Sequence, residues 1–204
     1  MYHFSDLNQI PVSLSLSGLH CPQLTLAWIQ KFHFSRGINA RMGNNLEQTL
    51  GQLLKQRGLK LATAESCTGG RIADHITDVP GSSDYFVGGV VAYSYEAKVA
   101  SLHVSWDTLR LNGAVSRETV IEMARGVRTT LGADIGISVS GIAGPGGGLP
   151  EKPVGTTWIG LSARDGDWAR MFVWDGDRQA NKDASSQAAL IMVMDYLDNK
   201  LGHG

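Results

Sequence analysis

The stretch Thr63-Ala64-Glu65-Ser66-Cys67-Thr68-Gly69-Gly70 joins a short apolar run to the start of a helical pattern. Leu59, Leu61 and Ala62 before it predict a buried strand, and residues 71–76 after it predict the first turns of a helix. The first N–H groups of such a helix have no partner within it, and the positive end of the helix dipole lies behind them. We therefore expect Ser66 to lie beside donors that can hold an anion or a developing oxyanion.

Upstream of this junction, an amphipathic helix is predicted by leucines on one face, with Gly58 as its end: Leu46, Leu50, Leu53 and Leu54. Residues 1–41 show neither a helical nor a strand period. The sequence thus predicts a folded domain over residues 42–204. We expect residues 1–41 to be a poorly ordered extension, or the product of an upstream translation start.

Downstream of the junction, strands and helices alternate first, and a hairpin follows. An apolar run at 85–93 predicts a central strand, Ser94 can cap the helix that follows it, and Asp165-Gly166 predicts an antiparallel turn. This order predicts a three-layer α/β/α sandwich with a mixed, mostly parallel β-sheet. The remaining expected elements are helices at 116–131 and 177–201, and strands at 135–140, 154–163 and 168–174.

Composition limits the classes of function. The chain has 204 residues, of which 43% are hydrophobic and 18% charged, and its net charge of −1 provides no basic field for nucleic acid. Residues 11–29 fit neither a signal peptide nor a membrane span. Cys21 and Cys67 are far apart, and the six histidines form no metal-binding pattern. We expect a cytoplasmic protein without metal, cofactor, nucleic-acid or membrane partner.

Three residues form the best candidate for catalysis: Ser66, Tyr93 and Lys98. A serine hydroxyl needs a base, and a phenolate or a neutral amine can serve where no histidine pattern is visible. The two could converge on Ser66 if Tyr93 ends a strand and Lys98 lies in the first turn of the next helix. A core tyrosine and a surface lysine are the alternative. Cys67 is the rival nucleophile, since a helix N-terminus lowers the pKa of a thiol.

A glycine-rich segment at residues 141–148 could wrap a phosphate with its backbone N–H groups, although a plain connecting loop is the alternative. Arg178, at the start of the last helix, could pair with a phosphate or carboxylate, or with a neighbouring acid on the surface. The substrate-binding set that we expect is Thr68, Gly69, Gly70, Ser140, Gly141, Gly144, Gly147 and Arg178.

Taken in series, these motifs resemble the CinA carboxy-terminal domain family. The resemblance covers residues 42–200 in order and rests on the segments at 63–70, 80–83, 93–98, 113–116, 140–148, 151–156 and 176–178. One departure is Tyr95, where the family usually has Asn, so two tyrosines lie near Lys98. The nucleotide-pyrophosphatase-like half of full-length CinA proteins has no counterpart here.

The resemblance implies a nicotinamide-nucleotide amidohydrolase (PncC-like), which converts nicotinamide mononucleotide and water into nicotinate mononucleotide and ammonia in pyridine-nucleotide recycling. It implies Ser66 as nucleophile, Tyr93 and Lys98 as its activating pair, no metal, and a homodimer. Two alternatives stay open. One is a non-catalytic module that senses a pyridine nucleotide, and the other is an amidase or esterase for another small substrate.

Overall fold

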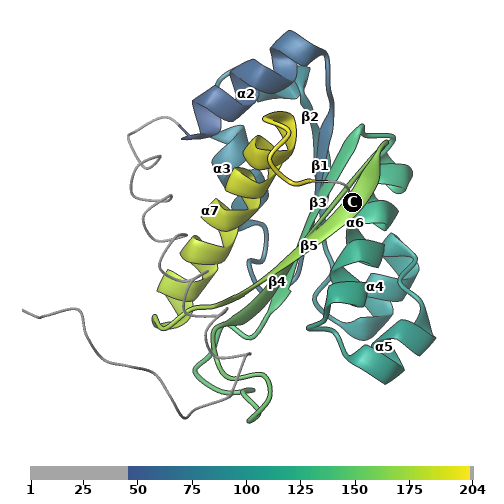
Figure 1. Cartoon of the computed structure of the whole chain (residues 1–204), viewed down its shortest axis with the longest axis vertical. Helices are drawn as coiled ribbons and strands as arrows, with labels where there is room; N and C mark the ends of the chain where they lie inside the picture. The colour runs from purple at the N-terminus through teal and green to yellow at the C-terminus, as the bar shows by residue number, and fades with distance from the viewer. Residues whose placement is uncertain (1–45, 203–204) are drawn as a thin grey trace, which may run out of the picture. The chain divides into compact units, whose positions relative to one another are not determined.

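Helices and strands alternate through the first part of the described chain, residues 46–202, in the computed structural model (Figure 1). The predictions for residues 1–41 lie outside the described residues. A short 3-10 helix, η1 (Ser82–Asp84), precedes β2. The other elements are α2 (Leu46–Arg57), β1 (Leu61–Glu65), α3 (Arg71–Thr77), β2 (Phe86–Val91), α4 (Tyr95–Leu102), α5 (Trp106–Asn112), α6 (Arg117–Leu131), β3 (Ile135–Gly141), β4 (Thr156–Ala163), β5 (Gly166–Val173) and α7 (Arg178–Leu197).

The described strands form one mixed sheet in the order β2-β1-β3-β4-β5. β1 pairs in parallel with β2 and with β3, whereas β3 pairs antiparallel with β4, and β4 antiparallel with β5. Among these strands only β4 runs in the opposite direction. The predicted hairpin is confirmed, because Ala163 lies opposite Gly166 across a two-residue turn.

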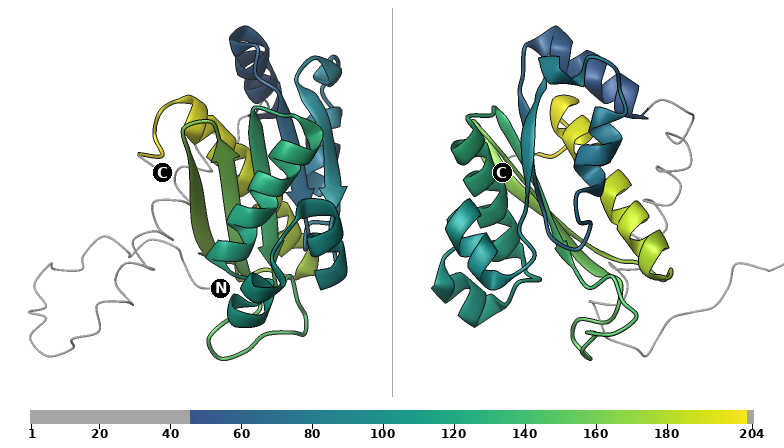
Figure 2. Two further views of the ribbon diagram at one scale, coloured as in Figure 1. Left: turned by 90° about the vertical axis from the view of Figure 1, so that its right-hand side faces the viewer. Right: turned by 180° about the vertical axis from the view of Figure 1, so that it is seen from behind.

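Helices cover both faces of the sheet, which confirms the predicted three-layer fold. α2, α3 and α7 lie on one face and α4, α5 and α6 on the other (Figures 1 and 2). β1 is buried along its whole length, and so are the first six residues of β3. Central strands covered on both faces carry mostly apolar or small side chains, which explains residues 61–64, whereas the last residue of β1, Glu65, is a buried acid.

One sequence prediction was wrong, and one helix was not predicted. β2 is an edge strand rather than a central one, since β1 is its only neighbour among the described strands. Its residues alternate between half-buried and exposed, and an apolar run by itself does not reveal how many neighbours a strand has. α5 was not predicted, because its seven residues are too few to show a helical period.

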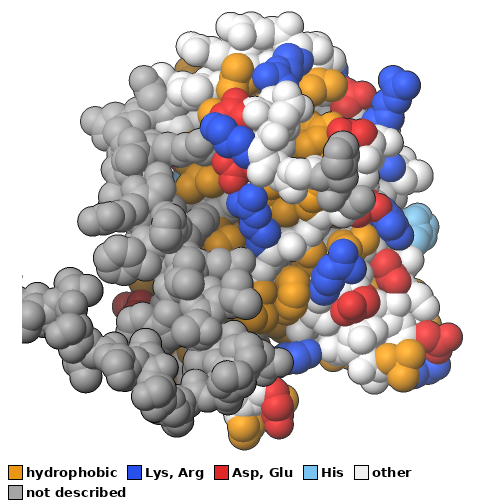
Figure 3. Space-filling model, in the orientation of Figure 1, with side chains coloured by type: hydrophobic (Ala, Val, Ile, Leu, Met, Phe, Trp, Pro, Cys, Tyr) orange, Lys and Arg blue, Asp and Glu red, His pale blue; other side chains and the backbone are white. Residues whose placement is uncertain are grey.

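The surface carries both signs of charge. Where Figure 3 shows side chains in colour, basic and acidic groups are interspersed. Within residues 46–202, no helix is both long and apolar enough to cross a bilayer. In the same described range, no group of three or more His, Cys, Asp or Glu side chains is arranged to hold a metal ion.

Candidate active site

Ser66 follows the last residue of β1, at the carboxyl ends of the parallel strands. The sheet holds its backbone on both sides, because the Ser66 N–H donates to the carbonyl of Val139 at 3.0 Å and the Ala92 N–H donates to that of Glu65 at 2.8 Å. Loops gather at this edge of an open α/β sheet, where such folds bind ligands. The side chain of Ser66 is 9% exposed, so a small opening to solvent remains.

Glu65, the residue before Ser66, caps helix α3. Its Oε2 accepts from the N–H groups of Gly70 (2.9 Å) and Ile72 (3.1 Å), and its Oε1 accepts from that of Ala73 (2.9 Å). Gly70 itself has a left-handed conformation and offers no side-chain cap. A buried carboxylate on three backbone donors fixes the path of the chain from β1 to α3, and Ser66 lies on that path.

Lys98 brings its amine to Ser66 from the other layer of helices. Ser94 caps α4, its Oγ accepting from the Ala97 N–H at 3.1 Å, and Lys98 lies one turn into that helix. The Lys98 Nζ is 3.0 Å from the Ser66 Oγ and donates to the Ala92 carbonyl at 2.7 Å. The side chain is 1% exposed, and burial lowers the pKa of Lys98 to about 8, against a smaller opposing effect of Cys67.

Cys67 is a buried side chain that packs in the protein interior. Burial raises the pKa of its thiol to about 12, although Lys98 and Lys182 lie near enough to act in the opposite direction. A thiol protonated at every physiological pH is a weak nucleophile. The geometry therefore favours Ser66 over its rival.

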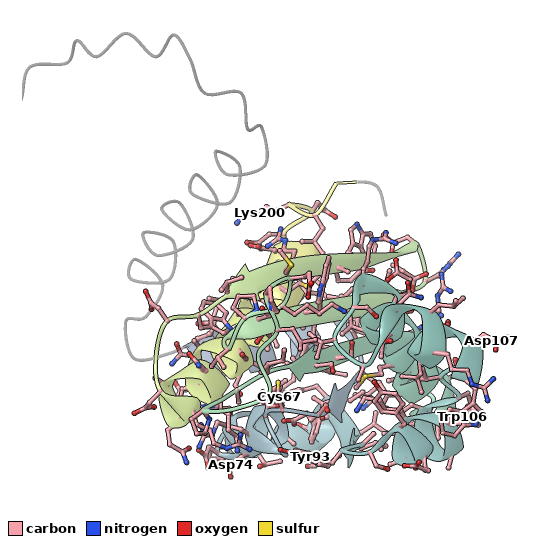
Figure 4. The ribbon with its side chains drawn as sticks, turned by 90° about the horizontal axis from the view of Figure 1, so that it is seen from below. Cys67, Asp74, Tyr93, Trp106, Asp107 and Lys200 are labelled. Atoms are coloured by element: carbon pink, nitrogen blue, oxygen red, sulfur yellow. The ribbon has the colours of Figure 1, made fainter. Side chains whose placement is uncertain are left out.

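Tyr93 contacts Arg178 rather than the buried amine. The phenol oxygen accepts from Arg178 Nη2 at 3.0 Å, and Arg178 Nη1 donates to the Gly144 carbonyl at 2.7 Å. Tyr93 is 62% exposed, and it lies in the same half of the view from below as Cys67 (Figure 4). The second tyrosine, Tyr95, accepts from the Ala114 N–H at 3.3 Å, which ties its phenol to the α5–α6 turn.

Two of the expected oxyanion donors already have acceptors. The Gly69 N–H donates to the Ser66 carbonyl at 3.2 Å, and the Gly70 N–H is the one held by Glu65. The hydroxyl of Thr68 is buried without a hydrogen-bond partner within residues 46–202. The interpretation of this loop as a set of free N–H groups is therefore corrected, because the Gly69 N–H is bound to the Ser66 carbonyl and the Gly70 N–H to the Glu65 carboxylate.

The glycine-rich segment divides into two parts. Gly141 ends strand β3, where a side chain would overlap Thr157, and Ser140 beside it is 1% exposed. Gly144 and Gly147 have left-handed backbone conformations in the loop, and Gly147 is exposed. The predicted binding residues thus spread from the sheet interior to the loop surface, with Gly144 nearest to Arg178.

Sequence reasoning missed two residues that shape the site. Glu65 belongs to the segment at 63–70 but was not predicted to act, although an acid just before a helix start is a capping signal. Asn181 is 2% exposed, donates to the Ala143 carbonyl at 3.1 Å and accepts from the Gly176 N–H at 3.0 Å. It joins the glycine loop to the start of α7. No local sequence pattern predicts a contact between residues 38 positions apart.

Comparison with known proteins identifies the family. Residues 43–197 match the CinA C-terminal domain. A CinA-like protein of Chloroherpeton thalassium is 52% identical over 157 residues, which are 75% of this chain and 37% of that protein. One of Chlorobaculum tepidum is 50% identical over 160 residues, 76% of this chain and 38% of that protein. The chain thus spans well under half the length of these relatives.

Solved structures agree with this assignment. A competence-damaged protein (CinA) superfamily protein of Klebsiella pneumoniae is 36% identical with a TM-score of 0.73, covering 76% of this chain and 96% of that one. The competence/damage inducible protein CihA of Agrobacterium tumefaciens is 39% identical with a TM-score of 0.72, covering 75% and 93%. The chain belongs to the CinA C-terminal domain family.

Proposed function

We propose that this domain is an amidohydrolase that converts nicotinamide mononucleotide and water into nicotinate mononucleotide and ammonia. One observation carries the chemistry: a buried lysine amine, with its pKa lowered to about 8, lies 3.0 Å from the hydroxyl of Ser66. A neutral amine at hydrogen-bond distance can take the proton of a serine as its oxygen attacks a carbonyl carbon. The choice of substrate rests on the family resemblance of the motifs.

The reaction proceeds in two steps. The Ser66 oxygen attacks the carboxamide carbon while Lys98 takes the hydroxyl proton, and a tetrahedral intermediate forms. When the C–N bond breaks, the departing nitrogen receives a proton from the protonated Lys98 amine and leaves as ammonia. Water then attacks the ester on Ser66, with Lys98 again as base, and releases the carboxylate.

Tyr93 has a role beside this pair. Its phenol is held by Arg178 at the exposed side of the site, where it can contact the substrate and assist proton transfer to the leaving group. Tyr95 is a poorer candidate, since its oxygen is engaged with the backbone of the α5–α6 turn. The phosphate of the nucleotide would lie near Arg178 and the Gly144 loop, and its binding would position the amide.

The sensing module is less well supported than the enzyme. A binding protein has no need of a lysine buried against a serine, because burial disfavours the charged amine and recognition does not require a lowered pKa. The domain would be cytoplasmic and act as a homodimer on a small molecule, without nucleic acid or membrane. An amidase or esterase for another substrate would use the same pair of residues, and assays with different substrates separate the two.

The test is ammonia release from nicotinamide mononucleotide by wild type, Ser66→Ala and Cys67→Ala. We expect Ser66→Ala to lower the turnover at least about 10³-fold, as when one member of a coupled catalytic set is removed. Cys67→Ala should retain activity, because its thiol is protonated and buried. Loss of turnover in the cysteine variant alone would contradict the assignment. A wild type that releases no ammonia would disprove the activity itself.

A further inference from the structure

Lys182 lies outside the segments that resemble the family motifs, and its amine lies close to Gly69 in the Ser66 loop. A Cβ atom at Gly69 would be 3.6 Å from the Lys182 Nζ, and the charge of Lys182 acts on the thiol of Cys67. Lys182 is half-buried and follows Arg178 by four residues on α7, so the two share one face of the helix. Lys182 therefore borders the loop that carries Ser66, while Arg178 contacts Tyr93 and the Gly144 carbonyl.

Three acids lie close to Lys182 in the sequence or beside the Ser66 loop, and each of them binds another group. Asp183 pairs with Arg71 at 2.7 Å, Asp177 caps α7 by accepting from the Ala180 N–H, and Glu65 holds the start of α3. No ion pair joins Lys182 or Arg178 to a carboxylate anywhere in residues 46–202. No carboxylate of the described residues therefore neutralises either charge, while Arg178 also donates to the Gly144 carbonyl and to the Tyr93 phenol.

The glycines of the loop leave space beside this charge. Gly69 has a left-handed conformation, which favours glycine, and it puts no side chain between the loop and the Lys182 amine. Residues Arg178 and Lys182 are about one helical turn apart at the amino end of a 20-residue helix, whose dipole adds positive potential. A dianionic group with several acceptor oxygens matches two such donors better than a single carboxylate does.

We propose that Lys182, together with Arg178, holds the phosphate monoester of the substrate and so selects phosphorylated over unphosphorylated amides. This inference deepens the proposed function and rests on it for the identity of the reaction. Binding at this subsite would place the amide over Ser66, while Lys98 keeps the role of base. Lys182 is thus a specificity-determining residue rather than part of the proton transfer.

The kinetic experiment compares wild type, Lys182→Met and Lys182→Arg on nicotinamide mononucleotide and on nicotinamide riboside, which lacks the phosphate. For Lys182→Met we expect KM for the nucleotide to rise about 10- to 100-fold with kcat nearly unchanged, since one charge-assisted contact common to ground and transition states is lost. The riboside kinetics should not change, and Lys182→Arg should recover most of the affinity.

Two kinetic results would overturn the inference. An equal fall in kcat for both substrates would mean that Lys182 stabilises the oxyanion instead, and unchanged nucleotide kinetics would mean that it binds nothing. Lys200→Met is the matched control, because Lys200 pairs with Asp198 beyond the far end of α7, about 30 Å along the helix from Arg178. That control should behave as wild type.

A binding measurement separates this inference from the proposed function. Inorganic phosphate and nicotinate mononucleotide should raise the melting temperature of wild type and Lys182→Arg, and should raise that of Lys182→Met far less. If the shift depends on Lys182 while no substrate releases ammonia, the subsite stands and the amidase proposal fails. If ammonia is released but the shift is the same in Lys182→Met, the subsite is wrong and the amidase proposal stands.

Discussion

At the scale of single residues, the proposed chemistry depends on a lysine whose pKa is lowered by burial. Lys98 has almost no contact with water, and its amine is held between the Ser66 hydroxyl and the Ala92 carbonyl. Burial favours the neutral form, which is the form that can accept a proton. With a pKa of about 8, roughly a tenth of the molecules carry the neutral amine at pH 7.

This predicts how activity depends on pH. In the proposed mechanism the reactive form of Lys98 is the deprotonated one, so kcat/KM should rise about tenfold per pH unit below pH 8 and level off above it. Ammonia release measured between about pH 6 and pH 9 provides the profile. Lys98→Arg is the control, because arginine stays protonated and should leave almost no activity. A flat profile, or an active arginine variant, would exclude Lys98 as the base.

The sequence predicted the residue types of the site better than their contacts. Ser66 and Lys98 come together because β1 and α4 both reach the carboxyl edge of the sheet, and strand-to-helix patterns could predict that edge. The turn between Ala92 and Ser94 exposes Tyr93 and brings it to Arg178. No periodicity specifies the direction of a side chain in such a turn. The position of Lys182 could not be predicted, because it depends on how α7 packs near the Ser66 loop, and these two segments are far apart in the sequence.

At the scale of elements, the junction between β1 and α3 is stabilised by one carboxylate. Glu65 accepts from three N–H groups at the start of the helix, where α3 has no side-chain cap of its own. The same bonds set the curvature of the loop that carries Ser66. The helix and the nucleophile therefore depend on a single acid.

Replacing that acid should affect both stability and activity. Glu65→Gln keeps the size of the side chain but removes the charge that three donors share, so we expect a loss of about 1 to 3 kcal/mol in the free energy of unfolding. Urea denaturation measures it, and turnover should fall as well because the Ser66 loop loosens. Glu118→Gln, at an exposed acid in the first turn of α6, is the matched control and should change little. Equal stability of the two variants would refute the cap.

Longer elements could be predicted from the sequence and shorter ones could not. α6 and α7 show apolar spacing over fifteen and twenty residues, which is enough to identify a helix and its buried face. α5 covers barely two turns, and β2 carries an apolar run although it lies at the edge of the sheet. An edge strand and a central strand differ in the number of neighbouring strands, and that number is set only when the chain folds.

At the scale of the whole molecule, α6 packs against the sheet and against α4 at distances that admit no side chain. A Cβ atom on Gly126 would lie 1.9 Å from the Leu102 carbonyl oxygen at the end of α4. On Gly136 of β3 it would lie 2.2 Å from the Ala124 carbonyl oxygen. The close contact of α6 with α4 and with the sheet therefore keeps α4 near enough to the sheet for the Lys98 amine to reach Ser66.

This packing makes Gly126 a sensitive position. Gly126→Ala must push α4 and α6 apart, and we expect a loss of about 3 kcal/mol, near the upper end for overpacking. Gly146→Ala is the control, because no atom lies within 4 Å of its added carbon. It should stay within about 0.5 kcal/mol of wild type in the same thermal or urea melts. A Gly126 variant as stable as this control would show that the two helices can separate freely.

The position of α7 in the chain has a consequence for biosynthesis. This helix follows every described strand, and it carries Arg178, Asn181 and Lys182, while the serine and its base lie far upstream. On the ribosome, a nascent chain can thus pair these strands and bring Ser66 to Lys98 before Arg178 and Lys182 have emerged. The proposed phosphate contacts would then form after the Ser66–Lys98 pair, when α7 leaves the exit tunnel and docks.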